Sequence, residues 1–196
     1  MARTQVRDER KKQILKALDE CLQEKSFEKT SIKDIARVAG VNHGVLHYYF
    51  KNKEDILLQY IDYVVDDFKG QVQEILFALG MEKLSRKNLL KEIFAFVNQK
   101  LVLDKRLNRT FIEIWEISLY NKAVRAKLKY AYQEWIGIVS MNITGSKTDK
   151  NASDILSIVM VAFWEGMSLF STIFEKRELD FQQVLDRFLQ GILKDL

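Results

Sequence analysis

The chain has 196 residues, of which 47% are hydrophobic and 30% charged, so it fits a soluble protein with a sizeable core rather than a disordered chain. It contains no proline, so long helices are never interrupted and we expect an all-α fold. The net charge of +4 permits nucleic-acid binding without requiring it, and the single cysteine, Cys21, which we interpret as a core residue, excludes an intrachain disulfide.

Basic residues are frequent at the start of the chain. Residues 1–8, which include Arg3 and Arg7, are expected to form a flexible arm. Such an arm either binds DNA phosphates or the neighbouring minor groove, or is a frayed, solvated terminus. The segment lacks an apolar signal core, so we expect a cytoplasmic protein. From Asp8 to about Glu24 the spacing of apolar residues predicts an amphipathic helix. Its apolar face consists of Ile14, Leu15, Leu18, Cys21 and Leu22.

Residues 30–53 predict two short helices joined by a tight turn. Ser31 is placed to cap the first helix, with Asp34 as the reciprocal partner of a capping box. Gly40 supplies the backbone freedom needed at the turn, and Asn42 is a good N-cap for the second helix. The spacing alone allows a plain αα-corner or a DNA-binding helix-turn-helix, in which the exposed face of the second helix enters a major groove.

A dense set of residues at fixed offsets extends this pattern to residue 57. The set comprises Thr30, Ile35, Ala36, Ala39, Gly40, Val41, Gly44, Leu46, Tyr48, Phe50, Lys53 and Leu57. It resembles the DNA-binding domain of the TetR family of bacterial transcriptional regulators. The sequence departs from the usual pattern at His43 and His47, where lysine and tyrosine are common, which leaves the operator sequence open.

The resemblance implies a sequence-specific regulator, commonly a repressor, that binds an inverted-repeat operator as a homodimer and is released by a small molecule. Phosphate contacts are expected from Thr30, Tyr48 and Lys53, and base contacts from the exposed face of the second helix. The full set of expected DNA-binding residues is Thr30, Ser31, Asn42, His43, Val45, His47, Tyr48 and Lys53.

A long helix is predicted from Lys53 to about Leu79. It starts beside the predicted DNA-reading helix and ends in a different part of the protein, so we expect it to link two domains. The resemblance implies that it moves when ligand binds. We therefore divide the chain into a helix-turn-helix domain, residues 1–52, and a larger ligand-binding and dimerisation domain, residues 53–196. Further helices are predicted over 85–103, 105–120, 121–145, 155–174 and 181–193, with a loop over 145–153.

The helix over 155–174 is almost wholly apolar and long enough to span a bilayer. We reject a membrane span because Glu165 lies at its centre, where a charge is costly in lipid. We expect one side to face its own core and the other a second subunit, so that the last two helices of two chains form a four-helix interface. Residues 115–119 and 163–170 resemble the betaine-regulator branch of the family.

Aromatic residues concentrate in the second domain, either as ordinary core or as the lining of a ligand pocket. A carboxylate in an apolar helix needs a partner, which for Glu165 is a cationic ligand, a basic side chain or its counterpart across a dimer. The expected ligand-binding residues are Phe94, Phe111, Trp115, Tyr120, Trp135, Trp164, Glu165 and Met167.

Two other functional classes fit the sequence less well. A di-iron helical-bundle enzyme would need two Glu-x-x-His pairs, and the chain has only His43 and His47, both in the helix-turn-helix. A non-specific architectural DNA binder would need more positive charge and less apolar sequence. We therefore expect double-stranded DNA, a small-molecule effector and a second copy of the chain as partners, and no catalytic residue, cofactor, metal or membrane.

Overall fold

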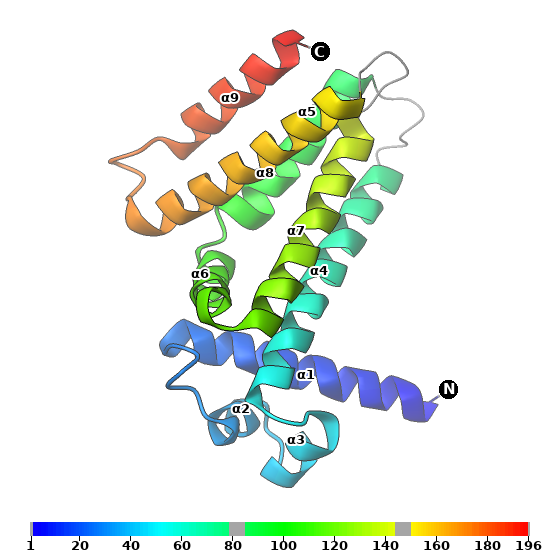
Figure 1. The fold of residues 1–196 in the computed structure, drawn as a ribbon, viewed down its shortest axis with the longest axis vertical. Coiled ribbons are helices and arrows are strands. Elements are labelled where there is room, and N and C mark those ends of the chain that lie inside the picture. The colour runs from blue at the N-terminus through cyan, green and yellow to red at the C-terminus, as the bar shows by residue number, and fades with distance from the viewer. Residues whose placement is uncertain (1, 79–84, 144–149, 196) are drawn as a thin grey trace. The chain divides into compact units, whose positions relative to one another are not determined.

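A computed structural model describes residues 2–78, 85–143 and 150–195, which form helices without any strand (Figure 1). The predicted all-α fold is confirmed. The elements are α1 (Ala2–Glu24), α2 (Ile32–Val38), α3 (His43–Tyr49), α4 (Lys53–Ala78), α5 (Arg86–Val97), η2 (Asn98–Val102), α6 (Lys105–Tyr120), α7 (Lys122–Ile143), α8 (Lys150–Ile173) and α9 (Phe181–Asp195), where η2 is a π-helical segment.

The chain divides into two compact units. Unit 1 comprises Met1–Lys69 and Arg109–Ala131, and unit 2 comprises Gly70–Asn108 and Tyr132–Leu196. Three helices, α4, α6 and α7, therefore contribute residues to both units. The functional division after residue 52 stays a prediction, because it separates roles rather than packing units.

Helices α1, α2 and α3 and the start of α4 pack around a small apolar core in unit 1. Ile14, Leu18 and Leu46 are fully buried, as are Phe50 and Ile56. Burial of side chains of this size stabilises a fold by roughly 1.5–3 kcal/mol each, which offsets the low stability expected of helices as short as α2 and α3.

Polar groups also join α1 to α4 and α6 within unit 1. The carboxylate of Asp19 accepts hydrogen bonds from the Tyr60 hydroxyl at 2.9 Å and from the Thr110 hydroxyl at 2.8 Å. Burial, and then the charge of Asp19, raise the pKa of Tyr60 far above its ordinary value. The phenol therefore stays protonated and donates its hydrogen bond throughout the neutral pH range.

Two predicted boundaries were wrong. Residues 2–8 are helical rather than a flexible arm, because no glycine or proline interrupts the chain before residue 24 and lengthening an existing helix is easier than starting one. The predicted loop over 145–153 falls partly on residues 144–149, which lie outside the described residues. Its last part, from Lys150, forms the first turn of α8, and there Ser153 is buried and its carbonyl accepts a hydrogen bond from the Ser157 hydroxyl.

Unit 2 is built around aromatic contacts between α5, α8 and α9. The rings of Phe163 and Phe188 stack at 3.6 Å between centroids, and Phe94 lies 5.5 Å from Trp164 and 6.1 Å from Phe188. The segment Ser153–Ile173 of α8 is long and apolar enough to cross a membrane, and 33% of its most apolar part is buried inside the protein. Core helices of soluble proteins have the same composition, so this finding is weak evidence for a membrane.

Candidate nucleic-acid interface and effector site

The start of α2 is held by the predicted capping box, which is confirmed. The Ser31 hydroxyl oxygen accepts a hydrogen bond from the Asp34 backbone N–H at 3.2 Å, and the Asp34 carboxylate accepts one from the Ser31 N–H at 2.8 Å. Lys25, which the sequence pattern did not single out, places its Nζ 2.8 Å from the same carboxylate. Lys25 and then Ser31 hold the pKa of Asp34 well below its usual range, so Asp34 stays ionised and fixes this end of the helix.

The turn between α2 and α3 requires glycine. Gly40 has a φ of +61°, in the left-handed region that side chains with a Cβ disfavour. Its N–H donates to the Arg37 carbonyl at 3.1 Å, and the Val41 N–H donates to the Ala36 carbonyl at 3.0 Å. This is the Schellman pattern, which satisfies the last carbonyls of α2 and sends the chain sharply into α3.

Helix α3 is anchored at its start and along one face. The side-chain oxygen of Asn42 accepts a hydrogen bond from the Gly44 N–H at 2.9 Å, which confirms the predicted N-cap. Leu46 is fully buried in the core of unit 1. These two attachments determine the rotation of α3 about its axis and therefore which of its side chains face outward.

The outward face of α3 carries the residues predicted to contact base edges, His43, Val45 and His47, together with Tyr48, which is predicted to contact phosphate. Val45 is 39% exposed and Tyr48 73% exposed, and His43 and His47 are exposed as well. The two imidazole rings meet edge to face with centroids 4.6 Å apart, so each limits the orientation of the other. Imidazole, phenol and aliphatic groups on one short exposed helix can contact base edges and phosphates.

Two residues predicted to contact DNA phosphates, Thr30 and Lys53, make hydrogen bonds to the backbone of the loop between α1 and α2. Thr30 is buried, and its hydroxyl donates to the Ser26 carbonyl at 3.0 Å. The Lys53 ammonium donates to the carbonyls of Phe27 at 2.7 Å and Glu28 at 3.3 Å, and it lies 4.3 Å from the centre of the Phe27 ring. Both residues thus position the entrance to α2, and their contact with phosphate stays a prediction.

The predicted ligand-binding residues are distributed over both units. Trp115 and Tyr120 are 47% and 86% exposed, so they are neither buried core nor part of an enclosed lining within unit 1. The indole N–H of the buried Trp164 has no hydrogen-bond partner among the described residues. Unit 1 holds Phe111, Trp115 and Tyr120, and unit 2 holds Phe94, Trp135, Trp164, Glu165 and Met167.

Glu165 is the one charged residue of the predicted ligand set. It is partly buried on α8, and its carboxyl group interacts with the hydroxyl of Tyr132 on α7. Burial raises the pKa of Glu165 to about 7, although the hydrogen bond from Tyr132 opposes the shift. The ring of Tyr132 also meets Trp135 edge to face, at 5.3 Å. A carboxyl group that is easily protonated therefore lies beside an aromatic cluster.

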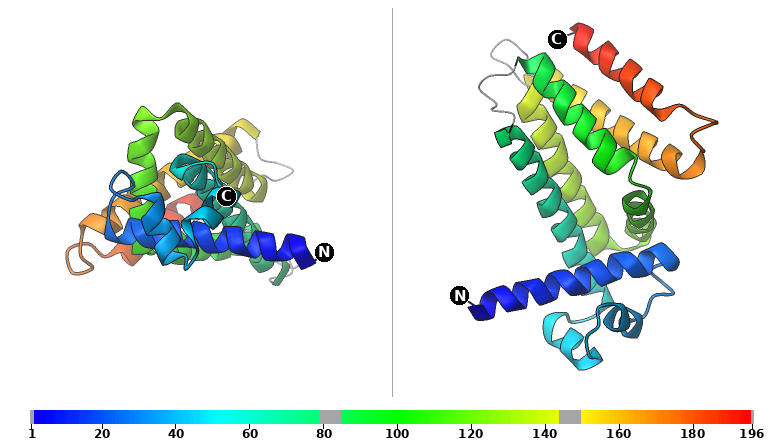
Figure 2. Two further views of the ribbon diagram at one scale, coloured as in Figure 1. Left: turned by 90° about the horizontal axis from the view of Figure 1, so that it is seen from below. Right: turned by 180° about the vertical axis from the view of Figure 1, so that it is seen from behind.

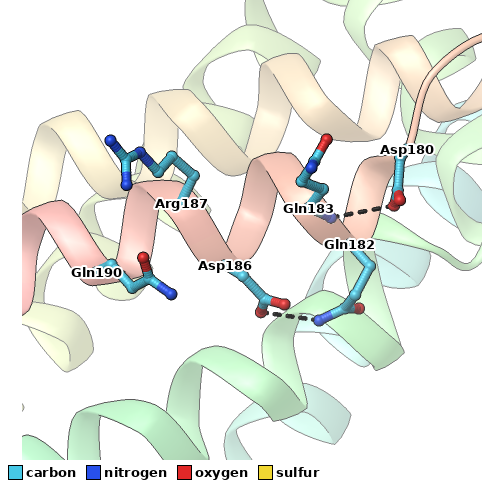
Figure 3. Close-up of a pocket in the computed structure, with 6 residues that line it drawn as sticks. All are labelled: Asp180, Gln182, Gln183, Asp186, Arg187 and Gln190. Carbon is cyan, nitrogen blue, oxygen red and sulfur yellow. Dashed lines mark hydrogen bonds between the residues drawn. The ribbon is translucent and has the colours of Figure 1, made fainter.

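The pocket shown in Figure 3 is elsewhere, along the polar face of α9. Its volume is about 400 Å³. Within it Gln182 donates to Asp186 at 2.9 Å, and the Gln183 N–H donates to Asp180 at 3.1 Å. The lining residues are Asp180, Gln182, Gln183, Asp186, Arg187 and Gln190. None of them belongs to the predicted ligand set, so this polar surface is distinct from the aromatic cluster.

The family comparison matches the helix-turn-helix. Residues 14–60 match the model of the bacterial regulatory proteins of the tetR family. The chain is 27% identical over 134 residues to the Fatty acid metabolism regulator protein of Bacillus subtilis (strain 168), an alignment that covers 67% of this chain and 65% of that protein. It is 25% identical over 201 residues to the HTH-type transcriptional repressor DhaR of Mycobacterium sp. (strain GP1), covering 100% of this chain and 94% of that one.

Solved structures share the fold over nearly the whole chain. A TetR-family transcriptional regulator from Rhodococcus sp. superimposes with a TM-score of 0.74 at 21% identity, covering 94% of this chain and 97% of that one. A transcriptional regulator from Saccharomonospora viridis, solved in complex with choline, superimposes with a TM-score of 0.72 at 21% identity, covering 93% of this chain and 96% of that one. At these identities the likeness establishes the fold.

Proposed function

We propose that this chain, a DNA-binding transcriptional regulator that belongs to the TetR family, is a cytoplasmic repressor that binds an inverted-repeat operator as a homodimer and is released by a small-molecule effector. The outward face of α3 carries the proposal. Its side chains are exposed on a helix whose rotation is determined by Asn42 and Leu46. Such a preorganised helix enters a major groove without reordering.

The first experiment is selection of bound sites from a random duplex pool, followed by titration with the selected site and a scrambled duplex. We expect an inverted repeat with half-sites about one helical turn, roughly 34 Å, apart. The double variant His43→Ala/His47→Ala should lose the preference for the selected site, because each good base contact contributes about 1–3 kcal/mol of discrimination. Tyr130→Ala, which removes an exposed aromatic ring from α7, is the matched control. Equal binding of the wild type to both duplexes would contradict the proposal.

The homodimer is proposed to form through α8, with α9 at its edge. The outer face of α8 carries large exposed apolar residues, and the outer face of α9 carries the polar residues of Figure 3. An apolar centre with a polar rim is the usual composition of a stable interface. The apolar α8 residues are Ile155, Ile158, Val159, Leu169, Phe170 and Ile173.

The effector is proposed to bind in unit 2, where a cationic group would face Glu165. A carboxylate next to the rings of Tyr132 and Trp135 provides both charge and cation–π attraction. An acceptor atom on the effector would satisfy the indole N–H of Trp164. The choline complex of the Saccharomonospora regulator supports a quaternary ammonium as the first probe. By linkage, an effector that prefers the conformation with poor DNA affinity lowers operator binding by the same factor as DNA lowers effector binding.

Thermal shift with choline, and with decanoate as an anionic counterpart, tests this effector class. Choline should raise the melting temperature of the wild type and should not change that of Glu165→Gln. The amide keeps the shape of the side chain and removes the charge that would bind choline. Stabilisation by decanoate alone would replace the cationic class with a fatty-acid class, which the name of the Bacillus relative makes the natural comparison.

A further inference from the structure

The N-terminal half of α1 extends beyond the core of unit 1. None of the residues from Gln5 to Gln13 is buried, and the first buried residue of the helix is Ile14. Figures 1 and 2 show these first turns projecting past the α2–α3 pair on the side of α3. From Ala2 to Gln13 the overhang measures about 18 Å at 1.5 Å per residue.

The overhang holds most of the excess positive charge of the chain. Residues 1–12 contain five basic and two acidic side chains, a formal charge of +3 compared with +4 for the whole sequence. Helical spacing places Arg7 and Arg10 in line with the buried residues Ile14 and Leu18. The arginines therefore continue, beyond the core, the helical face that packs inside unit 1.

The two acidic residues of the overhang lie away from this face. At 100° per residue Asp8 and Glu9 are each roughly 130° around the helix from the centre of the arginine line. They therefore do not neutralise it. Lys11 also points to the core side, where its Nζ lies 3.3 Å from the Gln59 side-chain oxygen on α4 and 6.0 Å from the centre of the Phe50 ring.

A chain of hydrogen bonds links this basic face to the helix-turn-helix. Arg10 donates to the side-chain oxygen of Gln13 at 2.8 Å, and the amide of Gln13 donates to the carbonyl of Ala39 at 2.6 Å. Ala39 is the C-cap of α2, directly before the turn into α3. Arg10 is therefore oriented on the side of the α2–α3 turn, and the other N–H groups of its guanidinium remain available, because arginine has five donors.

We infer that the basic face of the α1 overhang, with Arg7 and Arg10 at its centre, binds DNA phosphates that flank the half-site contacted by α3. This inference rests on the proposed function and extends its footprint. Arginine forks match phosphate oxygens, and a rigid helix reaches the backbone of a duplex rather than the floor of its minor groove, which is about 6 Å wide. The contacts supply affinity and no sequence preference.

The test compares the salt dependence of binding for the wild type, Arg7→Gln/Arg10→Gln and the control Lys122→Gln/Lys129→Gln, on a duplex that extends beyond both half-sites. The control removes two exposed charges from α7 in the same unit. If each arginine contacts one phosphate in each protomer, the slope of log K against log salt should shrink by about 3.6 in the arginine variant only. Arg7→Lys/Arg10→Lys should retain most of the slope.

A duplex trimmed to the half-sites should remove the difference between the wild type and the arginine variant, because the flanking phosphates are then absent. The ratio of affinities for the selected and scrambled full-length duplexes should stay unchanged in the arginine variant. An equal slope for wild type and arginine variant on the long duplex, with the selected site still preferred, would overturn this inference alone. Failure of the wild type to prefer any site would instead overturn the proposed function.

Discussion

The α2–α3 corner and helix α8 illustrate two ways in which a sequence specifies structure. The corner is short, and its ends are satisfied by neighbours in the chain: Ser31 with Asp34, Gly40 at the turn and Asn42 at the start of α3. Helix α8 is long and apolar, and its described contacts are with other helices far along the chain, as in the stacking of Phe163 on Phe188 of α9.

This difference has a functional consequence. Under the proposed function, the local caps of the corner hold α3 rigid and leave its outward face free to contact DNA. Helix α8 buries one side in unit 2 and leaves a large apolar face exposed, with Ile173 at 64%. An apolar face of this kind is typical of a surface that a partner covers. The stability of the corner should therefore be sensitive to small changes in backbone freedom. Dimerisation through α8 should instead be sensitive to charges introduced on its exposed apolar face.

The largest effect is expected from charges on the exposed face of α8. The double variant Ile158→Glu/Leu169→Glu should convert a dimer to a monomer and weaken operator binding by more than 100-fold, because unpaired carboxylates are costly to bury and a monomer reads one half-site. Sedimentation velocity and gel-shift titration measure the two effects. Lys122→Glu/Lys129→Glu, which places two carboxylates at exposed sites of α7 outside the proposed interface, should remain dimeric, and a dimeric α8 variant would contradict that interface.

In the corner, the buried anchor of α3 should matter most. Leu46→Ala is expected to lower the free energy of unfolding by about 2–5 kcal/mol, because removing this fully buried side chain leaves a cavity in the core of unit 1. Its exposed neighbour provides the control, since Val45→Ala should change stability by less than about 0.5 kcal/mol. Urea unfolding followed by circular dichroism gives both values, and equal effects would show that α3 is not anchored through Leu46.

On α8, the buried carboxyl group predicts a pH dependence. The pKa of Glu165 is about 7 in the folded protein and near the ordinary 4.5 when unfolded, so the folded state binds the extra proton between these values. The contribution of Glu165 to stability is therefore largest below pH 4.5, where Glu165 is protonated in both states. This contribution to the free energy of unfolding falls by up to about 3 kcal/mol as pH rises to about 7. Urea midpoints of the wild type should fall more steeply over this window than those of Glu165→Gln, and parallel curves would refute the shift.

The smallest effects, of opposite sign, are expected at two glycines of the corner. Gly40→Ala should destabilise by about 1–2 kcal/mol, because its φ of +61° is strained for any residue with a Cβ. Gly44→Ala, inside α3, should stabilise by up to about 1 kcal/mol, since an added Cβ would meet only Asn42 Oδ1 at an ordinary 3.6 Å. Thermal melts of the two variants measure the difference. A gain at Gly40 would mean that the turn does not need the left-handed conformation.

Several contacts near the α2–α3 corner were not predictable from local sequence. Gln13 reaches the Ala39 carbonyl, and Lys53 reaches the carbonyls of Phe27 and Glu28, across separations of 25 to 26 residues. A capping box is readable because its partners are three residues apart, whereas these contacts depend on how α1, the following loop and α4 pack. The roles of these side chains therefore became visible only in the folded unit.

The sequence by itself determined the all-α class, the capping box at Ser31, the glycine turn at Gly40 and the N-cap at Asn42, because each depends on residues within one or two helical turns. Only the tertiary structure decided how the aromatic residues divide between core and surface. The sequence placed Trp115 and Trp164 alike in the expected ligand-binding set, but the first is 47% exposed in unit 1 and the second 6% exposed in unit 2. An apolar stripe shows that a helix has a face to cover, and the packing of distant segments determines what covers it.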